Sequence, residues 1–318
     1  MPTVLVTGGA GFIGSHLCDA LLAEGHRVVA VDDLATGREE NLEQARAHGP
    51  QAFSFARIDV RDDGLRDVIM QHRPEVVMHL AAQSGVRPSL ADPANDASVN
   101  ILGSINVLGC AARAGVRKVV YAASGGTIYG EPEAIPVVES VAEGSHPRSP
   151  YGVSKKTVLS YLDLFWELSG LDSTALALGN VYGPRQDPRG EAGVISIFAS
   201  DMLTGQPPAV FGDGNQTRDY VYVSDTVRAF ILAMDRASRQ LVNIGTRRET
   251  SVNDIYRMLA DIIGFRAEPR YEPQPQGELR RIALDNERAR SVLDWEPTTE
   301  LDSGLRDVVA AFDNYGPS

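Results

Sequence analysis

Cysteine is scarce in this sequence. Cys18 and Cys110 are the only two cysteines among 318 residues, and both lie in apolar stretches with helical spacing. Neither stands at the spacing of a metal-binding motif. We therefore expect two reduced packing residues, without a redox role, and no metal site.

Long apolar runs and an excess of positive charge are also missing. No apolar run approaches the roughly 20 residues that span a bilayer, and the apolar stretch at residues 4–6 lacks the basic start and the cleavage site of a signal peptide. The formal net charge is −12, which disfavours nucleic acid, because its phosphates are bound by surplus Lys and Arg. We expect a cytoplasmic protein that binds neither membranes nor nucleic acid.

Short β-branched runs alternate with helical patterns in the first half of the chain. This alternation predicts βαβ units around a parallel sheet, the doubly wound α/β class. Beyond Tyr182 the connections become rich in Pro and Gly. We predict one domain over residues 1–182 and a smaller α/β region over residues 183–318, with some elements that cross back. The predicted strands cover residues 4–6, 27–31, 53–58, 76–80, 118–122 and 173–178.

Glycines recur at every third position directly after the first predicted strand. Gly8 permits a tight turn, Gly11 lets backbone N–H groups approach a pyrophosphate, and Gly14 allows close helix packing. Asp32 closes the second strand, where an acid that binds the ribose hydroxyls is expected. This combination predicts a Rossmann-type domain that binds NAD. A carboxylate there disfavours the 2′-phosphate of NADP, although Arg38 keeps NADP as an alternative.

Tyr151 and Lys155 lie one turn apart on the same face of a predicted helix that begins near Pro150. An ammonium near a phenol stabilises the phenolate, so we expect the pKa of Tyr151 to fall from about 10 toward the working pH. Tyr151 would then act as a base toward a substrate hydroxyl. An isolated pair of this kind would more often be a buried tyrosine and a solvent-reaching lysine. Its place behind a dinucleotide motif favours catalysis.

Together these motifs resemble those of the extended short-chain dehydrogenase/reductase family. The resemblance is to its NAD-dependent epimerases and dehydratases, most closely the UDP-glucose (UDP-galactose) 4-epimerases, and it runs nearly end to end. It rests on Thr7-Gly8-Gly9-Ala10-Gly11-Phe12-Ile13-Gly14, His79-Leu80-Ala81-Ala82, Val99-Asn100, Tyr129-Gly130, Tyr151 with Lys155, Asn180-Val181-Tyr182-Gly183-Pro184 and Arg218-Asp219-Tyr220.

The resemblance implies that bound NAD takes hydride from C4 of a UDP-sugar while Tyr151 takes the hydroxyl proton. The 4-keto sugar then turns over and regains hydride on its other face, which interconverts UDP-glucose and UDP-galactose. Two alternatives are 4-epimerases of UDP-glucuronate, whose carboxylate Arg185 or Arg189 could meet, or of a UDP-N-acetylhexosamine. A third is a non-catalytic protein that binds NAD and a nucleotide sugar.

One loop departs from the family pattern. The residue four before Tyr129 usually carries a hydroxyl group that bridges the tyrosine and the sugar, but here it is Gly125. We favour Ser124 for this role, with Thr127 as the second candidate. Dehydrating relatives carry an Asp-Glu pair in this loop, and decarboxylating relatives carry an acid there. Both are missing, which disfavours those two reactions.

The resemblance also implies the remaining ligands and the assembly. His79 receives no role, because a histidine that ends an apolar strand is more often structural. Phe211 matches a phenylalanine that packs on uracil, though a core position is equally compatible. A homodimer is expected to form through helices near residues 100–114 and 151–168. The apolar residues Leu159, Leu162 and Phe165 fit the seam of such an interface. The implied cofactor residues are Phe12, Ile13, Asp59, Val60, Leu80, Ala81, Ala82 and Asn100, which also helps place the catalytic helix. The implied substrate residues are Asn180, Phe211, Arg189, and Arg218 with Arg280 for the diphosphate.

Overall fold

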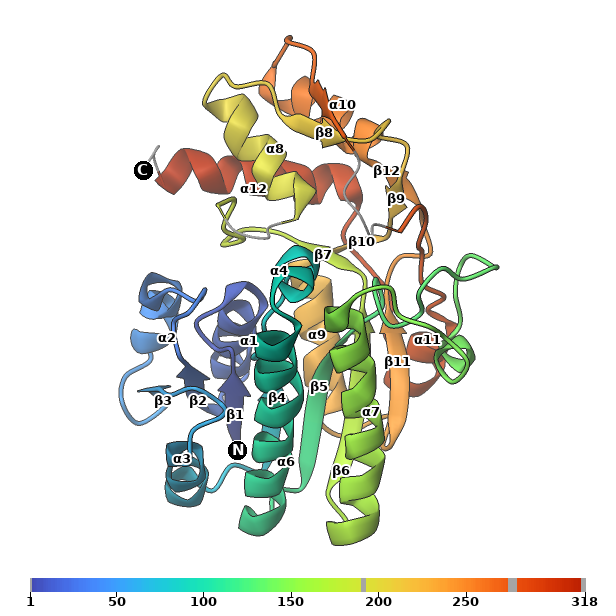
Figure 1. Cartoon of the computed structure of the whole chain (residues 1–318). Helices are drawn as coiled ribbons and strands as arrows, with labels where there is room; N and C mark the ends of the chain where they lie inside the picture. Colours follow the sequence, from blue (N-terminus) through green and yellow to red (C-terminus); the bar gives the residue numbers. More distant parts are fainter. Residues whose placement is uncertain (1, 190–192, 274–278, 316–318) are drawn as a thin grey trace.

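A parallel sheet of seven strands forms the centre of the molecule (Figure 1). The computed structural model describes residues 2–189, 193–273 and 279–315. The strand order is β11-β6-β5-β4-β1-β2-β3, so the chain winds in opposite directions from β1 and leaves a switch point between β1 and β4. The strands are β1 (Thr3–Thr7), β2 (Arg27–Asp32), β3 (Phe53–Arg57), β4 (Val76–His79), β5 (Lys118–Ser124), β6 (Asp172–Leu178) and β11 (Gln240–Ile244).

The six strands expected from the sequence are all present, which confirms the doubly wound parallel sheet. Val4, Leu5 and Val6 of β1 are fully buried, as expected for β-branched and aliphatic runs covered on both faces of a parallel sheet. The seventh strand comes from beyond residue 183, because β11 pairs in parallel with β6. Part of the region after residue 183 therefore belongs to the sheet, and the division of the chain at that residue stays a prediction.

Helices cover both faces of the sheet, and each face has its own apolar cluster. On one face Leu17 of α1 and Phe230 of α9 belong to the same cluster. On the other face Val107 of α6 and Val158 of α7 belong to the second cluster. The first group is α1 (Phe12–Ala23), α2 (Glu43–Arg46), α9 (Val223–Ala233) and α11 (Glu287–Leu293), and the second is α3 (Gly64–His72), α6 (Gly103–Ala114) and α7 (Pro150–Ser169).

The remaining elements form a second layer beyond the carboxyl ends of the sheet strands (Figure 1). Its core packs Phe198 of α8 edge to face against Tyr256 of α10, and a capping box of Ser251 and Asp254 begins α10. The helices are α8 (Val194–Leu203), α10 (Val252–Ile263) and α12 (Leu301–Tyr315), and the strand pairs are β7 (Asn180–Tyr182) with β10 (Tyr220–Tyr222), β8 (Ala209–Phe211) with β13 (Arg270–Glu272), and β9 (Thr217–Arg218) with β12 (Thr250–Ser251).

Short helices connect β4 to α6 near the carboxyl ends of the strands. They are α4 (Val86–Ala91), α5 (Pro93–Ala97) and the π-helical turn η2 (Ser98–Leu102). Two 3-10 turns, η1 (Glu39–Leu42) and η3 (Glu139–Ala142), complete the described elements. Within the described ranges, no helix is long and apolar enough to cross a membrane. The same residues contain no cluster of three metal-ligating side chains. Cys18 and Cys110 are buried as free thiols.

Candidate active site

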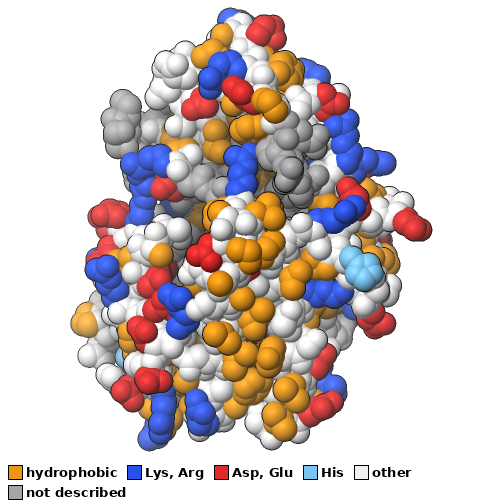
Figure 2. Space-filling model, viewed as in Figure 1, with side chains coloured by type: hydrophobic (Ala, Val, Ile, Leu, Met, Phe, Trp, Pro, Cys, Tyr) orange, Lys and Arg blue, Asp and Glu red, His pale blue; other side chains and the backbone are white. Residues whose placement is uncertain are grey.

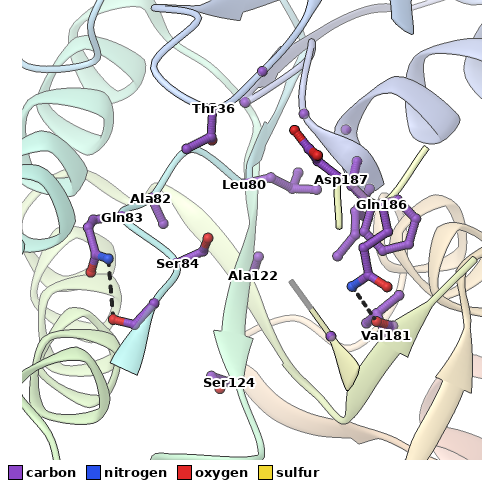
Figure 3. Close-up of a pocket in the computed structure, with 18 of the residues that line it drawn as sticks. Thr36, Leu80, Ala82, Gln83, Ser84, Ala122, Ser124, Val181, Gln186 and Asp187 are labelled. Atoms are coloured by element: carbon purple, nitrogen blue, oxygen red, sulfur yellow. Dashed lines mark hydrogen bonds between the residues drawn. The ribbon is translucent and has the colours of Figure 1, made fainter. Parts of the chain in front are cut away.

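A cavity of about 1760 Å³ lies where the sheet meets the C-terminal layer. In Figure 3 Ala82 and Gln83 line one side, Gln186 and Asp187 line the other, and Leu80 lies between them with Ala122 and Ser124 of β5. Pockets for one small molecule are typically about 300–1,000 Å³. This cavity therefore has room for two ligands, at the switch point where doubly wound folds bind them.

The glycine turn after β1 leaves its backbone open to the cavity. Gly8 has a φ of +70°, and a Cβ there would lie 2.8 Å from the Ala81 nitrogen. A Cβ at Gly14 would lie 2.0 Å from the Gly8 oxygen, so the start of α1 can pack against the turn only without a side chain. No side chain caps the first turn of α1, and such N–H groups attract anions. This cradle fits a pyrophosphate.

Asp32 ends β2 at the cavity wall. Its carboxylate accepts hydrogen bonds from the backbone nitrogens of Ala10 at 3.0 Å and Leu34 at 2.8 Å. Burial raises its pKa, and these hydrogen bonds oppose the shift. Arg38, the residue that kept NADP as an alternative, forms an ion pair with Asp187. An arginine with a carboxylate partner is less suited to a 2′-phosphate, so the cavity favours NAD.

The other expected cofactor residues, with one exception, line the same cavity. Asp59 is paired with Arg61, whose Nε lies 3.0 Å from the carboxylate, and this pairing lowers the pKa of Asp59. The exception is Asn100, which is buried behind the wall and bonds to Gln83 and Asp96. The residues found in the lining are Gly8, Gly11, Phe12, Ile13, Gly14, Asp32, Asp59, Val60, Leu80, Ala81 and Ala82.

A strap of residues 183–189 crosses from the C-terminal layer to α1 and borders the cavity. Arg185 donates to Asp19 at 2.7 Å, and the two side chains are only 14% and 11% exposed. His16 of α1 bonds to the Pro184 oxygen at 2.9 Å. Arg185 lines the cavity, but the carboxylate of Asp19 already binds its guanidinium, which disfavours a contact with a substrate carboxylate.

Tyr151 and Lys155 lie in the first turns of α7 and both line the cavity. Ser149 caps the helix by accepting from the Gly152 nitrogen at 3.1 Å, and Pro150 begins it. Lys155 Nζ donates to the Ala122 oxygen at 2.9 Å and lies 5.8 Å from the centre of the Tyr151 ring. The structure thus brings the pair together beside β5.

The pKa of Tyr151 moves in the direction opposite to our expectation. Removal from water raises it to about 12, and a side-chain hydrogen bond with Ser124 opposes this shift. Burial also lowers the pKa of Lys155 to about 8. Desolvation penalises the charged form of both groups, so in the chain alone the lysine does not overcome the cost of a buried phenolate.

Ser124 and Thr127 both line the cavity, but their partners differ. Ser124 bonds to Tyr151, whereas Thr127 Oγ1 contacts the Ser124 backbone oxygen at 3.5 Å. The glycine that departs from the family pattern is explained by Leu284, because a Cβ at Gly125 would lie 2.5 Å from its Cδ1. Position 125 faces the apolar core, and Ser124 faces the site.

The expected substrate residues divide into two groups. Asn180, Arg218 and Arg189 line the cavity. Phe211 and Arg280 are not in that lining. Arg280 instead forms a double hydrogen bond with Asp213, at 2.7 and 2.9 Å.

The guanidinium of Arg87 covers the Phe211 ring at 4.6 Å from its centre. Arg87 itself lines the cavity, and sequence reasoning missed it because nothing in the pattern of α4 distinguishes it from an ordinary surface arginine. His79 behaves as predicted, since its ring nitrogens bond to Thr7 at 2.8 Å and Ser104 at 2.9 Å.

Comparison with known proteins gives a consistent result. A model of the NAD dependent epimerase/dehydratase family matches residues 4–245. The UDP-glucose 4-epimerase of Mycolicibacterium smegmatis is 46% identical over 98% of each chain. The structure of UDP-glucose 4-epimerase from Thermotoga maritima with UDP-glucose has a TM-score of 0.94 at 43% identity, covering 98% of this chain and 99% of that one. The Thermus thermophilus enzyme in complex with NAD has a TM-score of 0.90 at 39% identity, over 98% and 99% of the two chains. The chain belongs to the NAD dependent epimerase/dehydratase family.

Proposed function

We propose that this protein is an NAD-dependent isomerase that interconverts UDP-glucose and UDP-galactose by inverting C4. The observation that carries the proposal is that Tyr151, Lys155 and Ser124 line the same cavity as the glycine cradle and Asp32. A base and a dinucleotide site that share one cavity can oxidise and reduce a carbon that carries a hydroxyl group. The similarity to UDP-glucose 4-epimerases supports the choice of substrate.

The cofactor would be held by the chain's backbone as much as by its side chains. The open N–H groups at the start of α1 suit the pyrophosphate, Asp32 suits the ribose hydroxyls, and Leu80 to Ala82 form the floor. When bound, NAD supplies a hydride acceptor at the sugar carbon and returns the hydride. Every proton that moves must be handled by residues of the chain.

Tyr151 is the proposed base, and Ser124 is the proposed bridge between its oxygen and the C4 hydroxyl. With a pKa near 12, Tyr151 is protonated at neutral pH in the chain alone, so positive charge nearby must stabilise the phenolate. Lys155, with a pKa near 8, is mostly an ammonium at neutral pH and can supply part of this charge. After the ketone turns over in the wide cavity, Tyr151 returns the proton.

The nucleotide diphosphate needs cations in a protein of net charge −12. Arg218 lines the cavity and suits this role, with Arg189 in the same lining, and the neutral amide of Asn180 can add a hydrogen bond. Arg280 pairs with Asp213 and would have to leave that carboxylate to bind phosphate. Arg87 lines the cavity and is therefore the better second candidate.

UDP-glucuronate remains a second candidate substrate because Arg189 lines the cavity. Its guanidinium is shared with Asp187, with Nε 3.4 Å from that carboxylate, so a sugar carboxylate would compete with an existing partner. This competition favours the neutral C6 hydroxymethyl group of UDP-glucose. In the described part of the chain, no contact of this kind supports a UDP-N-acetylhexosamine or a non-catalytic binding role.

We propose that two copies pair through α6 and α7. Apolar side chains gather on this face of the molecule (Figure 2), and Leu102, Val153, Leu164 and Leu168 are exposed there by 41–73%. Such a patch is typical of an interface between copies. Leu162, one of the residues expected in the seam, is instead buried within the subunit. A cytoplasmic location stays a prediction.

Product analysis by proton NMR tests the proposed reaction. The purified protein with NAD is incubated separately with UDP-galactose, UDP-glucuronate and UDP-N-acetylglucosamine, and Tyr151→Phe is the matched control. We expect UDP-galactose to give UDP-glucose fastest and the variant to lose about 10²–10⁴-fold in kcat. Faster turnover of the uronate would transfer the proposal to that substrate. No epimer from any of the three would refute it.

A further inference from the structure

Asp96 of α5 is a fully buried carboxylate that the proposed reaction does not use. Its Oδ2 accepts from Ser154 Oγ at 2.6 Å, and its Oδ1 accepts from Asn100 Nδ2 at 2.9 Å. Both donors are neutral side chains. Burying a carboxylate without an ion-pair partner is costly, so a residue of this kind calls for an explanation.

The two hydrogen bonds of Asp96 join the catalytic helix to the cavity wall. Ser154 lies on α7 directly before Lys155 and three residues after Tyr151. Asn100 bonds in turn to the backbone of Gln83, accepting from its nitrogen at 2.9 Å and donating to its oxygen at 3.0 Å. Gln83 belongs to the cavity lining. Asp96 therefore links the start of α7 to the wall that faces the cofactor.

We propose that Asp96 is a positioning residue for the Tyr151–Lys155 pair, which holds the start of α7 against the cofactor wall through Ser154 and Asn100 and adds negative charge to the surroundings of the pair. This inference rests on the proposed roles of Tyr151 and Lys155. Asp96 itself lies outside the cavity lining. It would act through its hydrogen bonds to Ser154 and Asn100 and through the electrostatic field of its carboxylate.

The charged and titratable groups around Lys155 come from four elements. Tyr151 lies on its own helix, and Tyr121 of β5 places its ring centre 5.0 Å from Nζ. His79 of β4 is buried and its pKa is lowered to about 3, so it is neutral. Among the residues that the structure describes, Asp96 of α5 is the group that opposes the effect of burial on the pKa of Lys155.

The sign of the expected effect follows from these neighbours. Asp96 raises the pKa of Lys155 by stabilising its ammonium, and it raises the pKa of Tyr151 by repelling the phenolate. Neutralising Asp96 should lower both pKa values. The pH profile of kcat should then move to lower pH as a whole, whereas the loss of a purely structural contact would lower kcat without moving the profile.

Three variants of the NAD-loaded protein separate these outcomes. Asp96→Asn removes the charge, Asp96→Glu retains it, and Ser154→Ala removes one hydrogen bond while leaving the carboxylate. The first readout is the pH profile of kcat. The second is the tyrosinate absorbance of Tyr151 against pH, taken as the difference between each protein and its Tyr151→Phe derivative, and it needs no turnover.

We expect Asp96→Asn to shift the midpoint of the kcat pH profile and the midpoint of the tyrosinate titration down by about one to two pH units. Asp96→Glu should restore the wild-type midpoints, and Ser154→Ala should lower kcat without a shift. Unchanged midpoints in Asp96→Asn, or an equal shift in Ser154→Ala, would overturn the proposal. If Asp96→Asn does not fold, Asp96→Ser removes the same charge and decides the question. If the wild type shows no epimerisation, the proposed function fails, while the tyrosinate titration still tests Asp96.

Discussion

Two hydroxyl residues, Ser124 and Thr127, line the same cavity as Tyr151, and they should differ in importance. Ser124 shares a hydrogen bond with Tyr151, while Thr127 contacts only a backbone oxygen at a long 3.5 Å. Removing a hydrogen bond to a charged group costs about 1.5–3 kcal/mol. We predict that Ser124→Ala lowers kcat about 10- to 100-fold and that Thr127→Ala changes it by no more than a few-fold. Steady-state kinetics on UDP-galactose measures both, and a larger effect of Thr127→Ala would reverse the assignment.

Gly125 gives a second prediction at this scale, about stability. An alanine there would place its Cβ 2.5 Å from Leu284 Cδ1, so Gly125→Ala should reduce the free energy of unfolding by about 1–3 kcal/mol. Gly126→Ala is the matched control, because its Cβ would lie an ordinary 3.6 Å from Asn180. Adding Leu284→Ala should recover part of the loss at position 125. Denaturant titration of the wild type, Gly125→Ala, Leu284→Ala and the double variant gives the coupling energy, and a coupling near zero would contradict the packing argument.

Individual residues were predictable where a role depends on the spacing of residues that are close together in the sequence. The glycine turn, Asp32 and the Tyr151–Lys155 pair could be placed from spacing alone. The pKa direction of Tyr151 could not, because it depends on how completely the fold removes the phenol from water. The position of Phe211 and Arg280 outside the cavity lining could not be predicted for a related reason, because their contact residues Arg87 and Asp213 lie far away in the sequence.

Among the structural elements, the strap of residues 183–189 should control release of the cofactor. Asp19 holds it through Arg185 in a mostly buried ion pair, and loss of one buried partner is strongly destabilising. We predict that Asp19→Asn speeds dissociation of NAD about tenfold, which corresponds to roughly 1.4 kcal/mol. Glu39→Gln, which breaks the exposed pair with Arg46, should have little effect. Stopped-flow measurement of NAD release distinguishes them, and equal rates would show that the strap does not retain the cofactor.

Whole strands were predictable when both of their faces are buried, because the sequence then shows a continuous apolar run. Strands such as β1 and β5 have apolar residues on both faces, and this pattern identifies central parallel strands. β11 was not identified as part of the sheet, because its partner β6 lies about sixty residues earlier and much of the intervening chain, including α8, forms the other layer. The short helices between β4 and α6 carry no distinct periodicity. Asp92 caps the start of α5, and tertiary contacts such as those of Asp96 hold this region in place.

At the scale of the whole molecule, the apolar face of α6 and α7 predicts self-association. We expect a homodimer in solution, and charges placed in the patch by Leu102→Glu with Leu164→Glu should convert it to a monomer, because charged groups resist burial. Met70→Glu changes a comparably exposed apolar residue on α3 and should leave the dimer intact. Light scattering at several concentrations tests this. A monomeric wild type, or an intact dimer in the double variant, would contradict the proposed interface.

The arrangement of the molecule places a dinucleotide cradle, a phenol and a wide substrate chamber in one cavity at the switch point of the sheet. This arrangement predicts that the hydrogen removed from C4 returns to the same carbon. The most direct test follows UDP-galactose that carries deuterium at C4, incubated with the NAD-loaded protein in ordinary water. We predict UDP-glucose that retains the deuterium at C4. Product with protium at C4, or no UDP-glucose at all, would contradict the account.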